Sequence, residues 1–221
     1  MEGPATLTPK LAFALAIAFN KEDTMLKRIA VALFGLLLPL QAQAAVTVVN
    51  DNVLYISGQT TTLQAARVTA ALESFDIDRV VIQGPGGDFF AGLTIGHAIA
   101  REGAVVQVLT GTRCISACAF SAMGGRRLMI GGELLFHRPF LRYVDTSETI
   151  DRTVQRSEAV GVVMAAYGLN MGYDVRFIYD IARHTSPCQF IVIGSPRELE
   201  QFRNGNDSLS VTYSYRTTEL C

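Results

Sequence analysis

The stretch "DRVVIQGPGGDFFAGLTIGHAIAREGAVVQVLTG" (residues 78–111) decides the fold class. It opens with a short apolar run that ends in a glycine turn, which predicts a buried strand. The residues from Phe89 have helical spacing up to Gly103, and "AVVQVLTG" then predicts a second strand. A strand, a helix and a strand in this order are typical of a parallel sheet with a right-handed crossover.

The same alternation of strands and helices continues on both sides of this stretch. Strands are predicted at "VTVVN", "VLYISG", "ELLFHRPF" and "FIVIG", and helices at "TTLQAARVTAALESF", "CISACAFSAMGG", "DVRFIYDIARHT" and "SPRELEQF". Short apolar strands separated by helices favour an α/β fold, with a mainly parallel sheet flanked by helices.

The first 44 residues differ from the rest and predict an export leader. "MLKRIAVALFGLLLPLQAQA" (residues 25–44) has a basic start, a short apolar run and a small-residue end, which is the pattern of a signal peptide cleaved after Ala44. The folded domain is then expected at residues 45–221, in the periplasm or secreted. An uncleaved leader would instead anchor the protein to the membrane.

Composition excludes some classes of function. The formal net charge is −1, so the basic excess of a nucleic-acid-binding protein is missing. We expect no metal site, because Cys114 and Cys118 have no further Cys or His neighbours and structural zinc takes four ligands. Nothing in the sequence indicates a cofactor.

All four cysteines, Cys114, Cys118, Cys188 and Cys221, follow the leader. An even number behind an export signal favours disulfides, and three complete pairings are open. Positions i and i+4 of a regular helix place Cβ atoms about 5–6 Å apart, whereas a disulfide needs about 3.8 Å. If Cys114 and Cys118 are bonded, Cys114 must therefore precede the helix. Cys188 and Cys221 could then tether the tail.

Ser116 lies between two cysteines at the start of a small-residue helix. A serine hydroxyl becomes a nucleophile when a base, usually histidine, takes its proton. Of the three histidines, His97 lies on an apolar helix and is read as structural, whereas His137 ends a strand one crossover after Ser116. From spacing alone, His137 is either the base or an ordinary strand-end histidine.

Candidate donors for an oxyanion hole surround this serine. The turn at Gly86 and Gly87 leaves backbone amides uncovered by side chains. The amide of Ala117 lies in the first helical turn, where backbone N–H groups lack partners. Most Pro-Gly-Gly turns have no catalytic role. The hypothesis of an oxyanion hole therefore depends on the order along the chain, in which this turn is followed by Ser116 and then by His137.

The segments "VVIQGPGGDFFAGLTIG", "CISACAF" and "LLFHRP" resemble the Clp protease proteolytic subunit and the wider crotonase-like superfamily. The Cys-x-Ser-Ala-Cys motif and "YGLNMGYDVRFIYDIA" resemble a secreted Clp-like branch most. The resemblance covers about residues 78–203 and implies a ClpP/crotonase-like fold of repeated β-β-α units. It implies that Ser116 is the nucleophile and His137 the base, with Gly86 or Gly87 and Ala117 forming the oxyanion hole.

The third catalytic group departs from the family pattern. The family has an acid before the strand that leads into the "SP" helix, but "ARHTSPCQFIVIGSP" contains no Asp or Glu. Asp180 is the nearest acid, and His184, Thr185 or Ser186 could orient the base instead. Signal-peptide peptidases of the superfamily use a lysine base, yet all three lysines (Lys10, Lys21 and Lys27) lie in the leader.

Two hypotheses of different classes follow. One is an extracytoplasmic serine hydrolase, a peptidase acting on peptides or proteins through a Ser-His acyl-enzyme. The other is a catalytically degenerate Clp-like binding or scaffold protein of the periplasm, which the missing acid favours. Crotonase-like folds often self-associate, so the resemblance allows a homo-oligomer. An ATP-driven unfoldase partner is not expected outside the cytoplasm.

Overall fold

The computed structural model of the 221-residue chain describes residues 45–49, 52–140, 150–203 and 215–220. The predicted leader, residues 1–44, lies outside the described residues. Within the described ranges, none of the helices combines the length and the apolar composition that a membrane span requires.

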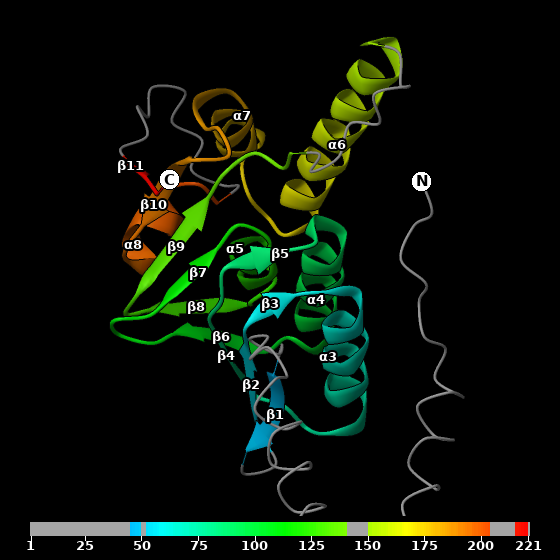
Figure 1. Cartoon of the computed structure of the whole chain (residues 1–221). Coiled ribbons are helices and arrows are strands. Elements are labelled where there is room, and N and C mark those ends of the chain that lie inside the picture. The colour runs from blue at the N-terminus through cyan, green and yellow to red at the C-terminus, as the bar shows by residue number, and fades with distance from the viewer. Residues whose placement is uncertain (1–44, 50–51, 141–149, 204–214, 221) are drawn as a thin grey trace, which may run out of the picture. The chain divides into compact units, whose positions relative to one another are not determined.

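A five-stranded sheet forms the first half of the domain (Figure 1). Its order is β1-β2-β4-β6-β8, and every neighbouring pair is parallel except β1 with β2. Its strands are β1 (Ala45–Val49), β2 (Val53–Ser57), β4 (Arg79–Ile82), β6 (Val105–Val108) and β8 (Arg127–Ile130). The mainly parallel sheet predicted from the strand–helix alternation is confirmed.

Two helices, α3 (Thr62–Ser74) and α4 (Phe89–Glu102), make the crossovers and pack side by side. The Thr61 hydroxyl accepts a hydrogen bond from Gln64 N at the start of α3, and the Asp88 carboxylate accepts one from Ala91 N at the start of α4. Gly103 ends α4 in the left-handed conformation (φ 64°), as the sequence predicts.

A second sheet lies against the C-terminal helices. Its order is β11-β10-β9-β7, with β7 and β9 parallel and the other two pairs antiparallel. Its strands are β7 (Arg113–Ile115), β9 (Glu133–Phe136), β10 (Gln189–Ile193) and β11 (Arg216–Glu219). The helices of this half are α5 (Ala117–Ala122), α6 (Ile150–Asn170), α7 (Val175–His184) and α8 (Pro196–Glu200). Two short strands, β3 (Gln59–Thr60) and β5 (Gly86–Gly87), form a parallel pair.

The short helix α5 lies at the centre of the core. All six of its residues are buried, and α4 packs closely against it. A Cβ at Gly92 would lie 2.5 Å from the carbonyl oxygen of Ala117, so only a glycine lets the two helices approach this far. The buried Tyr167 hydroxyl of α6 donates a hydrogen bond to Phe120 O (2.6 Å), which attaches α6 to the same helix.

The structure adds strands that the sequence did not predict. Residues 113–115 form β7 rather than only a turn before the helix, and residues 127–130 form β8. Both strands are three or four residues long, and β8 alternates exposed and buried positions within a stretch rich in glycine and arginine. Such short segments become strands because neighbouring strands already offer hydrogen-bonding partners.

Candidate active site

Ser116 occupies the turn between β7 and α5. Its backbone has φ 58° and ψ −124°, and it is the only non-glycine residue with positive φ in the described part of the chain. An L-residue adopts this conformation only when its surroundings impose it. A sharp turn from a strand to a helix is also how the nucleophilic serines of α/β-hydrolases are presented. The half-buried Ser116 has the backbone geometry of such a nucleophile.

A disulfide encloses this turn. Cys114, in β7, is bonded to Cys118, in the first turn of α5, with a Cα–Cα distance of 5.1 Å. The expectation that Cys114 precedes the helix if the two are bonded is confirmed. Cys188 is also disulfide-bonded, whereas Cys221 lies outside the described residues. The Cys114–Cys118 bond limits how far the backbone on either side of Ser116 can separate.

The glycine turn lies directly against Ser116. Gly84 pairs with β7, because Gly84 N donates to Arg113 O (3.0 Å) and Ile115 N donates to Gly84 O (2.9 Å). Two residues later, Gly86 has φ 83°, and a Cβ there would lie 2.7 Å from Ser116 Cβ. This turn needs glycine because both its backbone angle and the space beside Ser116 exclude a side chain.

Two of the three predicted oxyanion residues meet at this point. A Cβ on Gly86 would lie 3.0 Å from Ala117 N. Ala117 is the first residue of α5, so its N–H has no partner inside the helix, and no hydrogen bond uses it in the described part of the chain. Gly87 instead lies against β3, where its Cβ would be 2.2 Å from Thr60 O. The structure therefore brings the Gly86 backbone and Ala117 N beside Ser116. Asp88 N donates to Thr60 O (2.9 Å), and this parallel pairing directs the N–H of Gly87 away from β3.

His137 follows β9, the parallel neighbour of β7. Ile115 is opposite Leu135 in this pair, and the next amide, Ser116 N, donates to Leu135 O (2.8 Å). Ser116 and His137 therefore leave adjacent strands at the same edge of the sheet, where strands are about 4.8 Å apart. Among the hydrogen bonds of the described residues, none joins Ser116 Oγ to the His137 ring.

The His137 ring is buried between aromatic side chains. It lies 4.9 Å from the Phe190 ring and 5.5 Å from the Phe140 ring, measured between centroids. Its Nδ1 atom is 2.8 Å from the carbonyl oxygen of Arg138. Burial lowers the pKa of His137 below 6.5, and the hydrogen bond with the Arg138 carbonyl acts in the opposite direction. The ring is therefore uncharged at neutral pH, the form that a general base requires.

The acid predicted from the sequence lies elsewhere. Asp180 Oδ1 is 3.5 Å from Nδ1 of His184, and the same Nδ1 is 3.3 Å from the Tyr215 hydroxyl. The structure therefore brings Asp180 to His184 and not to His137, because positions 180 and 184 are one turn apart on α7. Burial raises the pKa of Asp180, while the nearby His184 lowers it.

The group that does contact the imidazole is a backbone carbonyl. Arg138 O accepts from His137, and the amide of Arg138 donates to the hydroxyl of Thr185 (2.7 Å). Sequence reasoning named Thr185 as one of three alternatives to an acid, but it missed the carbonyl. A backbone carbonyl has no signature in a sequence, since every residue carries one.

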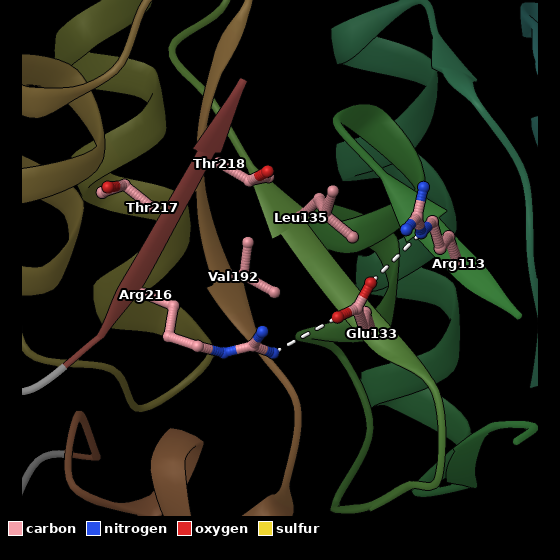
Figure 2. A pocket seen from close by; sticks show the side chains of 7 residues that line it. All are labelled: Arg113, Glu133, Leu135, Val192, Arg216, Thr217 and Thr218. Atoms are coloured by element: carbon pink, nitrogen blue, oxygen red, sulfur yellow. Dashed lines mark hydrogen bonds and ion pairs between the residues drawn. The ribbon is translucent and has the colours of Figure 1, made fainter. Parts of the chain in front are cut away.

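A hollow lies on the sheet face to which Leu135 contributes (Figure 2). It has a volume of about 390 Å³, with Leu135 and Val192 among its lining residues. Glu133 bridges two arginines there, Arg113 at 3.1 Å and Arg216 at 3.2 Å. Leu135 and Val192 also pack with Phe190, whose ring contacts His137. The hollow and His137 thus lie on one continuous face of the second sheet.

His97 has a different place in the molecule. It is exposed on α4, and its ring contacts the Tyr167 ring at 5.1 Å between centroids. The structural role of His97 stays a prediction.

No family model matches the chain, and no curated protein matches it. Solved structures are similar at 17–18% sequence identity. One is the 1510-N membrane-bound stomatin-specific protease, as a lysine-to-alanine mutant in complex with a substrate peptide. The match covers 71% of this chain and 74% of that protease, with a TM-score of 0.50. A serine-to-alanine mutant of the same protease has a TM-score of 0.49, with 71% and 78% covered. An asparagine-to-aspartate mutant of ClpP1 from Listeria monocytogenes has a TM-score of 0.47, with 61% and 81% covered. The similarity to the peptide-bound protease shows that this chain shares the fold of that protease.

Proposed function

We propose that this protein is an extracytoplasmic serine peptidase, with Ser116 as the nucleophile and His137 as the general base. One observation carries the proposal. The strained backbone of Ser116 lies at the sheet edge where the Gly86 turn, the Ala117 amide at the start of α5 and the strand leading to His137 come together. The shared fold with a protease supports the same class of function.

The chemistry follows from these groups. Nε2 of His137 takes the proton from Ser116 Oγ as this oxygen attacks the substrate carbonyl carbon. The amides of Gly86 or Gly87 and of Ala117 donate to the oxygen that becomes negative. His137 then gives its proton to the leaving amine, and an acyl-enzyme remains. Water, deprotonated by His137, then attacks the acyl carbon of this ester. The bond from that carbon to Ser116 Oγ breaks, Oγ takes the proton back from His137, and the second product leaves.

The compartment and partners belong to the same proposal. The predicted leader and the Cys114–Cys118 disulfide both fit an oxidising compartment. The substrate is a peptide or an unfolded protein, because no ATP-driven unfoldase is expected there. Self-association is proposed from the resemblance alone.

The test is labelling by a fluorophosphonate probe of the purified, oxidised protein. Wild type is expected to be labelled once per chain at Ser116, and both Ser116→Ala and His137→Ala should abolish labelling. Equal labelling of Ser116→Ala and wild type would remove Ser116 from this role.

A second candidate is a binding or scaffold protein that retains the fold without catalysis. It is favoured by the position of Asp180, which pairs with His184 and leaves His137 without a carboxylate among its described contacts. The two candidate functions predict different outcomes when a variant is expressed in a cell whose own copy of the protein has been deleted. Full rescue of the deletion phenotype by Ser116→Ala would support the scaffold, and failure to rescue, with normal protein levels, would support the peptidase.

A further inference from the structure

We propose that Thr185 is a positioning residue, which holds the Arg138 backbone so that the Arg138 carbonyl orients His137 in place of a carboxylate. This inference rests on the proposed function and names the third member of its catalytic arrangement. Thr185 acts through the backbone and touches no substrate.

Three hydrogen bonds in series carry the inference. The Thr185 hydroxyl donates to Ile181 O of α7 (2.5 Å) and accepts from Arg138 N (2.7 Å). The carbonyl of Arg138 is then 2.8 Å from Nδ1 of His137. The N–H and the C=O of Arg138 belong to neighbouring peptide groups joined at its Cα, so the Thr185 bond positions the carbonyl by holding the Arg138 backbone.

The hydroxyl of Thr185 both donates and accepts a hydrogen bond in this series. Thr185 is 3% exposed, and its one donor and one acceptor bond connect two backbone segments. Ile181, which receives the donated hydrogen, is itself buried on the core face of α7. The series therefore begins on a rigid helix, and water does not compete for the hydroxyl.

Pro139 restricts the same carbonyl from the other side. A residue before proline is confined to extended backbone conformations. Arg138 is therefore limited by Pro139 in its backbone angles and by Thr185 through its amide. This gives a physical reason for the order His-Arg-Pro after β9.

The consequence for His137 is a defined tautomer. A carbonyl oxygen only accepts hydrogen bonds, so Nδ1 must carry the hydrogen and Nε2 must have the free lone pair. Nε2 is the atom that takes the serine proton in Ser-His hydrolases. A neutral carbonyl performs the orienting role of the family acid without adding a negative charge.

The test compares Thr185→Val, which keeps the shape but removes the hydroxyl, with Thr185→Ser, which keeps the hydroxyl. The first readout is the tautomer of His137, measured in the full chain by long-range ¹⁵N–¹H NMR correlations assigned with His→Gln variants. Wild type and Thr185→Ser should show a hydrogen on Nδ1. Thr185→Val should shift the population towards a hydrogen on Nε2. The second readout is fluorophosphonate labelling, which should slow about tenfold or more in Thr185→Val, because a base moved out of place loses rate.

Thr94→Val is the matched control. The Thr94 hydroxyl also donates to the carbonyl four residues earlier, Phe90 O (3.0 Å), but it lies on the exposed face of α4. Its variant should keep the wild-type tautomer and labelling rate. Thermal unfolding of each variant shows whether it is folded before either readout is taken.

The outcomes separate the two proposals. A hydrogen on Nε2 of His137 in wild type, or unchanged tautomer and labelling in folded Thr185→Val, would overturn the role of Thr185. If Thr185→Val does not fold, labelling of Thr185→Ser below one tenth of the wild-type rate would overturn it as well. Absence of labelling in wild type with a hydrogen on Nδ1 would instead overturn the peptidase and leave the hydrogen-bond series intact.

Discussion

Gly86 and Ser116 lie in backbone contact, although thirty positions separate them in sequence. A Cβ on Gly86 would lie 2.7 Å from Ser116 Cβ and 2.5 Å from the carbonyl oxygen of Ile115. Real Cβ atoms are not found this close to other heavy atoms. The glycine turn after β4 and the serine turn after β7 therefore form a single unit, which any side chain between them would separate.

The first prediction concerns this contact. Gly86→Ala should destabilise the fold by about 3 kcal/mol, the sum of a positive-φ penalty and a backbone overlap. It should also abolish fluorophosphonate labelling, because the glycine turn beside Ser116 is displaced. Gly111→Ala is the control: Gly111 has φ 77°, but a Cβ added there would have no heavy atom within 4 Å. This change should lower the free energy of unfolding by about 1–2 kcal/mol and leave fluorophosphonate labelling unchanged. Equal effects of the two changes, measured by urea unfolding, would contradict the contact.

The second prediction concerns the disulfide around Ser116. Replacing both Cys114 and Cys118 with alanine should reduce the free energy of unfolding by on the order of 2 kcal/mol, the entropy of a five-residue loop. Labelling should slow as well, because the turn at Ser116 is then free to relax. Both cysteines are buried, at 0% and 2% exposure, so a mild reductant should leave folded wild type labelled at its normal rate. Rapid loss of labelling on mild reduction would show that the bond opens in the folded protein.

The third prediction concerns pH. Burial lowers the pKa of His137 below 6.5, and a general base works in its unprotonated form. Labelling should therefore rise with pH and reach half its maximum below pH 6.5. His97→Gln, which changes an exposed ring on α4, should keep this profile. A midpoint above pH 6.5 in wild type would contradict the burial of His137.

The same lowered pKa makes stability depend on pH. Below pH 6.5 the unfolded chain binds a proton at His137 before the folded protein does, so this contribution to stability is present above 6.5 and is lost as pH falls through the folded pKa. His137→Gln should therefore lose less stability between pH 7.5 and pH 5 than wild type. Urea unfolding at the two pH values measures the difference, and identical losses would contradict the prediction.

The fourth prediction tests whether a hydrogen bond that stabilises α5 also affects the reactivity of Ser116. Tyr167→Phe removes a buried hydrogen bond to Phe120 O. It should lower the free energy of unfolding by about 1–2 kcal/mol, because the buried carbonyl loses one of its hydrogen-bond donors. Labelling should be unchanged, since Tyr167 contacts the end of α5 that is remote from Ser116. Tyr179→Phe removes an exposed hydroxyl that accepts from Arg183, and its effect on thermal unfolding should be close to zero.

Much of the fold could be predicted because it depends on local patterns. The apolar run before Gly84 and the helix that ends at Gly103 are features of neighbouring residues, and they predicted β4, α4 and the parallel sheet. Strands β7 and β8 could not be predicted, because each is short and gains its hydrogen bonds from segments far away in the chain.

The residues of the candidate site likewise fall into those that the sequence predicted and those that it did not. Ser116, His137 and the glycine turn were identified from residue type and order, and the structure brings Ser116 and His137 to one sheet edge, with Gly86 beside Ser116. Asp180 was selected by residue type and nearness in sequence, yet helix geometry directs it to His184. The Arg138 carbonyl was missed because backbone groups are the same in every residue.

The amino-acid sequence by itself determined the alternation of strands and helices, and which side chains could act as a nucleophile and a base. Only the tertiary structure decided which group accepts a hydrogen bond from His137 and which glycine lies against Ser116. Residue types define chemical capacity, but contacts a few ångströms long between distant segments exist only once the sheets and helices have packed together.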